Sequence, residues 1–497
     1  MLVEVYSCDK DMRNKFFPSA TEILAVGVFL LVLANGSQAL SVDSDLGRHL
    51  TLGAYILEHR VIPTDNLFSY TLAGASRPPY EWLSQVVFAI SYRLLGLNGV
   101  ILFTALIVGA AIAIVFHQSA RRSKSLLVSL IVVLLATGAT SIHWLPRPHI
   151  ITFLFLAMWV DGLEKIRKAD NVNLLFFPAL MLFWANLHGG FIFGFLALAA
   201  YVAGWVWDWR RRQSSKEVGK KFLLIGLTSL AASIVTPDLW RNWEAVLNNR
   251  STFILNRTVE TMPPNLFEPS NAPFITLLSL AAFFALVNWR SVSAAHIFLL
   301  GGHGGMALLM MRNIPLFAIA CAPILAEWIA ATMNRFPAWK RFDERFINLV
   351  APSQSFLLPT LAAIIAIGFF AYNQSLNKQL YQFNPQVFPV RAADWLEENP
   401  QKGNMFNEFN WGGYLLYRFW PRELVFVDSQ SDFYGEPLMR DYETMMLEKN
   451  NWRDLLDQYQ INWAIIPADS PLAIQLKQEG NWTALYEDPT AVIFQRK

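Results

Sequence analysis

Residues 41–93 read SVDSDLGRHLTLGAYILEHRVIPTDNLFSYTLAGASRPPYEWLSQVVFAISYR and follow the first long apolar run of the chain. The stretch opens with two carboxylates, Asp43 and Asp45, and Arg48 and His49 come three and four residues after Asp45. Ionisable groups beside a membrane span are costly and usually face a cavity or a partner. We therefore expect this stretch to hold a catalytic centre around which later polar residues gather.

The composition predicts a protein with many membrane-spanning helices. Hydrophobic residues make up 54% of the 497 residues and charged residues 16%, whereas about 25% is usual in a soluble domain. The apolar residues form runs of roughly 16 to 22 residues, which is long enough to cross a bilayer. Eleven spans are predicted, at about 20–40, 98–117, 125–142, 148–163, 172–187, 190–208, 221–236, 273–288, 294–311, 313–333 and 355–372.

Two segments between the first two spans suit helices that lie on the membrane surface. Residues 45–59 have helical spacing of apolar positions but are short and charged. Residues 79–96 contain Glu81 and Arg93, which a spanning helix would have to bury. We expect residues 41–97 to be an outer loop with two interfacial helices.

The distribution of Lys and Arg predicts the orientation. With a cytoplasmic N-terminus, the inner connections hold most of these residues, as cytoplasmic loops usually do. Counting residues 79–96 as a span would invert every later loop. The chain is thus predicted to be a multi-pass protein of the inner (plasma) membrane, with its C-terminal part on the outer or periplasmic side.

The predicted transmembrane module, 1–372, is followed by an acidic domain, 373–497. From Asn373 onward the chain carries 11 Lys/Arg and 17 Asp/Glu, a net charge of −6. Short strands, predicted at 405–407, 424–428, 463–467, 483–486 and 492–495, alternate with helical segments. This order predicts a small α/β layer with a largely parallel sheet whose last two strands form a hairpin.

Polar residues that the topology places at the outer ends of spans are candidate substrate ligands. Several such residues at one depth indicate a shared outer cavity, whereas Lys and Arg dominate the inner ends, where no comparable set of acids and histidines is found. An Asp or Arg just after a span can also be only a solvated flank, and an Arg can be an interface anchor. The candidates are Arg48, His49, Glu81, Arg147, His149, Asn186, His188, Asp238 and Arg312.

These residue types suit the handling of a phosphorylated substrate. Arginine binds phosphate through its planar fork, and a partly desolvated Asp can act as general base toward a hydroxyl. Asp43 and Asp45 could also hold a divalent metal, Mg or Mn. Asp428, Asp432 and Tyr434, in VDSQSDFYG, lie where the C-terminal end of a predicted strand meets a loop. An acceptor or a metal could bind there, although a plain turn-and-cap role is the simpler interpretation.

The first 120 residues resemble the GT-C superfamily of membrane glycosyltransferases, such as protein O-mannosyltransferases and lipid A aminoarabinose transferases. In that pattern an Asp begins the first surface helix, here DLGRHLTLGAYIL from Asp45, and a Pro-Pro pair begins the second, here RPPYEWLSQVVFAISYRLLG. Those two families usually place a second acid directly after the Asp, where this chain has Leu46.

The resemblance implies transfer of a sugar from a polyprenyl-phosphate-linked donor, with inversion and with Asp45 as general base. Asp43 would then be a supporting or metal-binding acid. The implied partners are the lipid-linked donor and the bilayer, with no nucleic acid, and the acceptor stays open. Two alternatives remain: a transporter or flippase for a lipid-linked saccharide, which usually shows repeats that this chain lacks, and a non-catalytic membrane scaffold.

Overall fold

A computed structural model describes residues 18–77, 80–247, 251–349, 357–376 and 378–497. Cys8 and the pair Pro78–Pro79 lie outside the described residues. Within them, eleven helices match the predicted spans one to one: α2 (Ala20–Ala34), the second part of α5 (Trp82–Ser123), α6 (Leu126–Thr140), α7 (His149–Arg167), α8 (Phe176–Leu187), α9 (Ile192–Arg210), α10 (Lys216–Ile234), α13 (Ala272–Val287), α14 (Ala294–Leu309), α15 (Ile314–Met333) and α17 (Leu357–Ser375).

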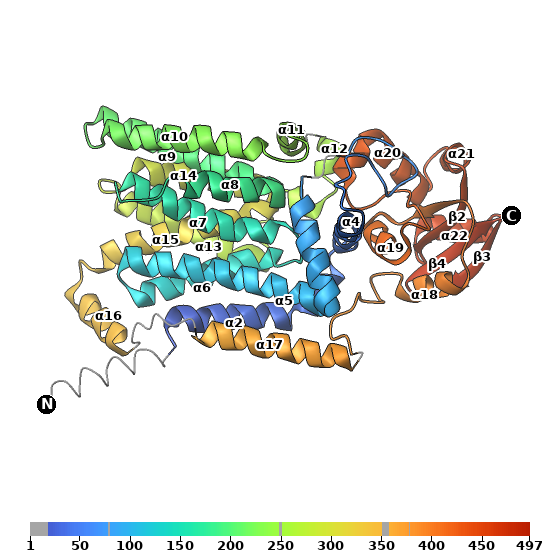
Figure 1. Ribbon diagram of the computed structural model, residues 1–497, viewed down its shortest axis with the longest axis horizontal. Helices are drawn as coiled ribbons and strands as arrows, with labels where there is room; N and C mark the ends of the chain where they lie inside the picture. The colour runs from blue at the N-terminus through green and yellow to red at the C-terminus, as the bar shows by residue number, and fades with distance from the viewer. Residues whose placement is uncertain (1–17, 78–79, 248–250, 350–356, 377) are drawn as a thin grey trace.

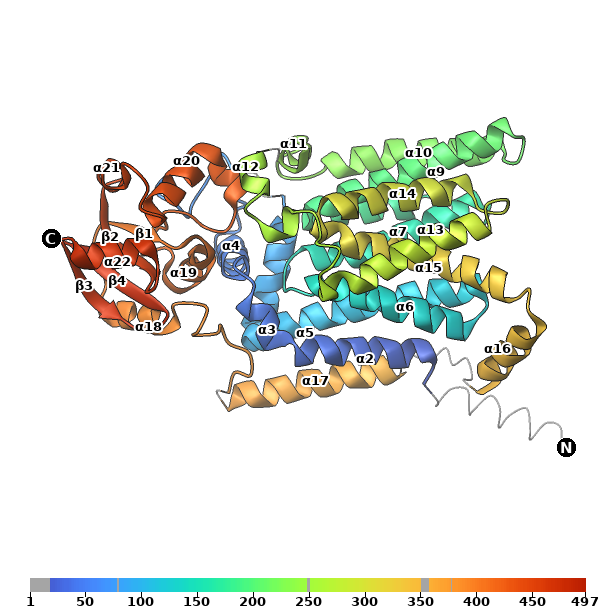
Figure 2. The ribbon, with the colours of Figure 1, turned by 180° about the vertical axis from the view of Figure 1, so that it is seen from behind.

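These helices lie side by side in one bundle (Figure 1). By length and composition, six described helices are apolar enough to cross a membrane, and α2, α8 and α14 are shorter apolar helices. α15 lies at the centre of the bundle, because nearly all of its side chains are buried, whereas α17 lies at the edge beside α2 (Figure 2). The predicted polytopic bundle with a small C-terminal α/β domain is confirmed.

Residues 41–97 cross one end of the bundle, which we call the domain end because the C-terminal domain sits on it (Figure 1). The short helix α3 (Gly36–Ser41) leads into α4 (Leu46–His59). α5 is two helices joined at a kink, where Gly96 has a φ of 62° that only glycine adopts freely. The first part of α5, up to Leu95, runs crosswise to the bundle in Figure 1.

Shorter helices connect the spans: α11 (Arg241–Leu247) and α12 (Thr252–Leu255) follow α10, and α16 (Pro337–Leu349) follows α15. The C-terminal domain contains α18 (Val390–Glu398), β1 (Asn404–Asn407), α19 (Gly412–Phe419), α20 (Ser431–Met446), α21 (Trp452–Gln458), β2 (Ile461–Pro467), α22 (Pro471–Gln478), β3 (Trp482–Glu487) and β4 (Ala491–Arg496).

The sheet of this domain differs from the prediction in two respects. Its strand order is β1-β2-β4-β3, with β1 and β2 parallel and the other two pairs antiparallel, so the sheet is mixed rather than largely parallel. The predicted hairpin, β3–β4, is confirmed. Residues 424–428 join no strand of this sheet, because Val425 instead pairs with Ser69 of the outer loop in an isolated bridge.

α4 and α19 pack so closely that two glycines are required at their crossing. A Cβ atom on Gly47 would lie 2.1 Å from the Gly413 carbonyl oxygen, and one on Gly413 would lie 2.4 Å from the Ser44 carbonyl oxygen. Both obstacles are backbone atoms, which cannot rotate away. This contact sets the C-terminal domain directly against the acidic start of α4.

We expect Gly413→Ala to weaken the docking of the C-terminal domain, because overpacking of this kind costs about 1–3 kcal/mol. The measurements are the melting temperature in detergent and the rate of proteolysis in the connection between α17 and α18. Gly480→Ala is the matched control, since a Cβ there meets nothing within 4 Å. Equal melting and cleavage of the two variants would contradict a tightly docked domain.

Two acids and a histidine also gather at the opposite end of the bundle, contrary to the expectation from the sequence. Glu164 of α7 is buried and contacts His296 of α14 at 3.0 Å, and Arg122 of α5 pairs with Glu327 of α15 at 2.8 Å. Tyr201 of α9 donates a hydrogen bond to Glu164. This polar cluster joins five helices, and sequence spacing could not reveal it because each helix supplies only one or two members.

Candidate active site

The two acids at the start of α4 have different local roles. Asp43 Oδ1 accepts hydrogen bonds from the backbone N–H groups of Asp45, at 2.9 Å, and Leu46, at 3.2 Å. Asp43 therefore satisfies donors at the N-terminus of α4, as capping residues do. This leaves the carboxylate of Asp45, which occupies the cap position itself, free to contact other side chains.

Arg147 joins the two acids. Its Nε lies 2.8 Å from Asp43 Oδ1 and its Nη1 lies 3.0 Å from Asp45 Oδ2. Nη1 also lies 3.3 Å from Glu260 Oε2. Arg147 stands between Pro146 and Pro148 ahead of α7, where the fixed φ angles of two prolines restrain its backbone.

The pKa values of the two carboxyl groups are shifted in opposite directions. Burial raises the pKa of Asp43, whose Oδ2 has no hydrogen-bond partner among the described residues. Burial also acts on Asp45, but the positive charges of Arg147 and Arg48 outweigh it and lower the pKa of Asp45 below its usual range. Asp45 is thus the more acidic member of the pair.

Arg48 and His49 follow Asp45 on α4 and are buried. Arg48 Nη2 lies 3.7 Å from Asp45 Oδ1, and Arg48 Nε lies 4.0 Å from Asp428 Oδ1 of the C-terminal domain. His49 Nδ1 lies 3.3 Å from Gln85 Nε2. Burial and the charge of Arg48 lower the pKa of His49 well below its usual value, so the ring is neutral at pH 7.

The C-terminal domain reaches this centre through Asp428, Ser429 and Gln430. The Ser429 hydroxyl donates a hydrogen bond to Asp45 Oδ1. Arg77 Nη2 donates to both oxygens of Asp428, at 3.1 and 3.0 Å, and to Gln430 Oε1, at 2.6 Å. The motif VDSQSDFYG drew attention to this segment in the sequence. Ser429 and Asp45 are 384 residues apart, however, so no local spacing of residues predicts their contact.

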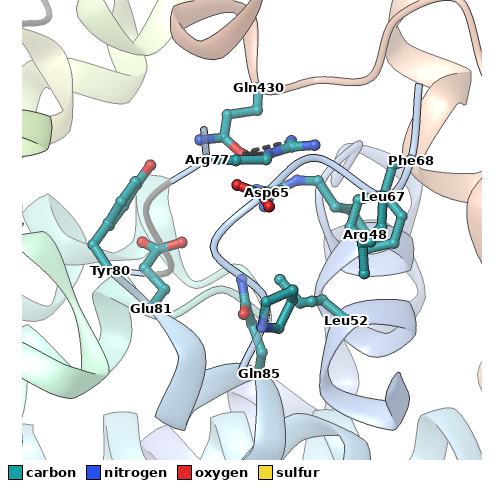
Figure 3. A pocket seen from close by; sticks show the side chains of 11 residues that line it. Arg48, Leu52, Asp65, Leu67, Phe68, Arg77, Tyr80, Glu81, Gln85 and Gln430 are labelled. Carbon is teal, nitrogen blue, oxygen red and sulfur yellow. Dashed lines mark hydrogen bonds between the residues drawn. The ribbon is translucent and has the colours of Figure 1, made fainter. Parts of the chain in front are cut away.

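A small polar pocket lies between α4, the first part of α5 and Gln430. Figure 3 shows Tyr80 and Glu81 on one side, Gln85 and Leu52 below, and Arg48 with Phe68 opposite, while Arg77 and Gln430 close the top. Burial raises the pKa of Glu81 to about 8, so this carboxyl group is largely protonated at pH 7.

The histidines near the centre line one side of it. His188 Nε2 lies 3.7 Å from Glu81 Oε1, and its Nδ1 lies 2.7 Å from Thr152 Oγ1. His149 lies beside His188, with ring centroids 6.4 Å apart, and its Nε2 contacts the His143 carbonyl oxygen at 2.7 Å. Burial lowers the pKa of His188 to about 3, so it is neutral at pH 7.

Of the candidate ligands, Arg48 and Arg147 form ion pairs with Asp45 in the described residues, whereas Asn186, Asp238 and Arg312 contact neither Asp43 nor Asp45 there. The Asn186 side chain accepts a hydrogen bond from Trp82 and donates to the carbonyl oxygens of Leu182 and Val235, which is a structural role. Asp238 is half-buried and has no ion pair within the described ranges. Arg312 is exposed and likewise has no described ion-pair partner, although its charge acts on His188.

The residues do not fit a divalent metal at Asp43 and Asp45. In the described part of the chain, no group of three or more His, Cys, Asp and Glu side chains is arranged to hold a metal ion. The guanidinium of Arg147 already pairs with both carboxylates.

A larger groove of about 420 Å³ lies beside the same acidic turn. Ser41, Val42 and Ser44 form one wall, and Glu408, Trp411 and Asp469 of the C-terminal domain belong to the other. Burial raises the pKa of Glu408 to about 7. Both openings, the pocket and the groove, are thus bounded by the outer loop and the C-terminal domain together.

No protein-family model and no curated protein matches this sequence. The structure is similar to the oligosaccharyltransferase of Archaeoglobus fulgidus in its apo form, with a TM-score of 0.60, 12% identity, and coverage of 90% of this chain and 68% of that one. It is also similar to the archaeal oligosaccharyltransferase AglB of Archaeoglobus fulgidus in complex with an inhibitory peptide and a dolichol-phosphate, with a TM-score of 0.57, 12% identity, and coverage of 94% and 74%.

A third similar structure is ArnT from Cupriavidus metallidurans bound to undecaprenyl phosphate, with a TM-score of 0.48, 12% identity, and coverage of 95% and 97%. At 12% identity the likeness to the archaeal structures is one of fold. The chain therefore has the fold of these archaeal oligosaccharyltransferases, which agrees with the fold implied by the resemblance of the first 120 residues.

Proposed function

We propose that this protein is a GT-C glycosyltransferase that moves a sugar from a polyprenyl-phosphate-linked donor to an acceptor hydroxyl. The observation that carries the proposal is the geometry of the Asp45 carboxylate, which is held by Arg147, Arg48 and Ser429 at the domain end of the bundle. The fold adds support, because a structure of AglB with the same architecture holds a dolichol-phosphate.

In the proposed step, the acceptor oxygen attacks the anomeric carbon of the sugar, and the bond from that carbon to the phosphate oxygen breaks with inversion. The electron pair leaves with the polyprenyl phosphate, and the acceptor proton passes to Asp45. A carboxylate with a lowered pKa is a weak base, so it takes the proton only from a strongly acidic group. Proton transfer therefore comes late, once the new bond has made the acceptor oxygen acidic.

The leaving phosphate requires a cation that is not already paired. Arg147 is committed to Asp43, Asp45 and Glu260, whereas Arg312 is exposed and has no ion-pair partner among the described residues. We assign phosphate binding to Arg312, whose planar fork suits that geometry. Charge stabilisation of this kind is usually a large part of catalysis.

We also propose the orientation that the Lys and Arg distribution predicts, with the N-terminus in the cytoplasm and the domain end on the outer side of the plasma membrane. The donor would then lie with its lipid tail between spans and its sugar phosphate at the domain end.

The test is release of polyprenyl phosphate by the purified, reconstituted protein from a panel of undecaprenyl-phosphate-linked monosaccharides. This readout reports transfer to any acceptor, including water, and membranes of the producing cell supply native acceptors. Release from none of the donors, with membranes present, would reject the proposal.

Since the residues do not fit a metal, we expect the same release with EDTA as without it. Loss of release in EDTA that Mg²⁺ or Mn²⁺ restores would instead assign a metal to the reaction. Buffer with EDTA and excess Mg²⁺ is the control for effects of the chelator itself.

A further inference from the structure

We propose that Ser429 of the C-terminal domain is a positioning residue for Asp45, so that this domain forms part of the active site. The inference rests on the proposed function. It assigns to the C-terminal domain a role in the active site through a contact made by one serine of this chain.

The contact completes the fixation of the Asp45 carboxylate. Arg147 Nη1 holds Oδ2 at 3.0 Å, and the Ser429 hydroxyl donates to Oδ1. A carboxylate that is held through both oxygens cannot rotate about its bond to Cβ. Ser429 thereby fixes the plane of the carboxylate and the direction in which it meets an acceptor proton. A loss of orientation at a reacting group is costly to the rate.

The segment that carries Ser429 is itself firmly held on both sides. Before it, Asp428 is fully buried and accepts two hydrogen bonds from Arg77. After it, the Gln430 backbone N–H donates to Asp428 Oδ1 at 2.9 Å, and the Gln430 side chain accepts from Arg77. Such a network orients a site side chain without touching the substrate.

Arg77 is an outer-loop residue, so it joins the C-terminal segment to the loop that also contains Asp45. Its guanidinium is buried, stacks over the Phe433 ring at 4.5 Å, and donates to Asn66 Oδ1 at 3.2 Å. Besides Arg77, the neighbouring residues Ser44, Asp45 and Arg48 also contact residues 428–430. Their position opposite α4 follows from the glycine crossing of α4 and α19.

The test compares two substitutions that have the same shape. Ser429→Thr keeps the hydroxyl, whereas Ser429→Val has the shape of Thr without it. We expect Ser429→Val to lower kcat for release of polyprenyl phosphate by about 10- to 100-fold, the usual weight of a hydrogen bond to a charged group. KM for the lipid-linked donor should be unchanged, and Ser429→Thr should retain most of the rate. Ser431→Thr and Ser431→Val, two residues further on, serve as the matched control pair.

Equal kcat values for Ser429→Val and Ser429→Thr would overturn the inference. So would an equal loss in both, because steric damage affects the two alike. Melting temperatures of the two variants show whether the shape is tolerated. If the wild-type protein releases polyprenyl phosphate and Asp45→Asn does not, the proposed function stands even when the Ser429 pair fails. If the wild-type protein releases none, the proposed function fails first and this inference fails with it.

Discussion

Asp45→Asn is expected to reduce release of polyprenyl phosphate by about 100- to 10,000-fold, the range in which a positioned proton acceptor contributes. The amide has the size of the carboxylate but can neither take the acceptor proton nor balance the charge of Arg48. Arg147 keeps its contacts with Asp43 and Glu260, so the fold should survive. The measurements are the release rate and the melting temperature in the same detergent.

Asp161→Asn is the matched control for this substitution, because Asp161 is a half-buried acid that pairs with Arg121 and Lys165 at the opposite end of the bundle. It should release polyprenyl phosphate at the wild-type rate. Full activity in Asp45→Asn would rule out Asp45 as the proton acceptor. Equal losses in both variants would indicate a general effect of removing a half-buried acid.

Arg147→Gln should have the second large effect, on stability as well as on activity. The substitution leaves the buried Asp43 and the half-buried Asp45 without the cation that joins them, and breaking a buried ion pair costs about 3–5 kcal/mol. We expect a clear drop in melting temperature and loss of release. Arg147→Lys keeps the charge but cannot hold both carboxylates through one planar group, so it should lie between the wild type and Arg147→Gln.

A double variant separates the effect of the unpaired carboxylates on stability from the effect of the lost Arg147 packing. Asp43→Asn in the Arg147→Gln background removes one of the two unpaired carboxylates, so part of the lost stability should return. Release should stay low, because the ionised form of Asp45 still lacks its strongest partner. A melting temperature of Arg147→Gln equal to that of the wild type would contradict the bridging role of Arg147.

The helices could be predicted from the sequence because the bilayer sets a minimum length for an apolar run, and the residues of α13, for example, form a run without a charged side chain. The strand expected at 424–428 was wrong for a physical reason. Its residues have a strand-like apolar pattern, but the bridge from Val425 to Ser69 and the burial of Asp428 hold them against the outer loop.

Residues of the candidate site could be predicted only where a charged side chain lies next to a membrane span. Asp43, Asp45, Arg48 and Arg147 stand out because charge next to an apolar run is costly. Ser429 carries no charge, and Arg77 lies in a polar loop, so neither has a local signal. The pairing of Arg147 with the acids, rather than with phosphate, depends on where α7 begins relative to α4, which the spacing of residues does not fix.

The groove beside the acidic turn has a consequence for which molecules can meet there. Its walls include Glu408 and Asp469 but no Lys, Arg or His. Asp469, and Glu408 in its ionised form, repel phosphates and carboxylates, whereas a neutral hydroxyl compound meets no such barrier. Under the proposed function, this groove would exclude the lipid-linked sugar phosphate and stay open to a neutral acceptor.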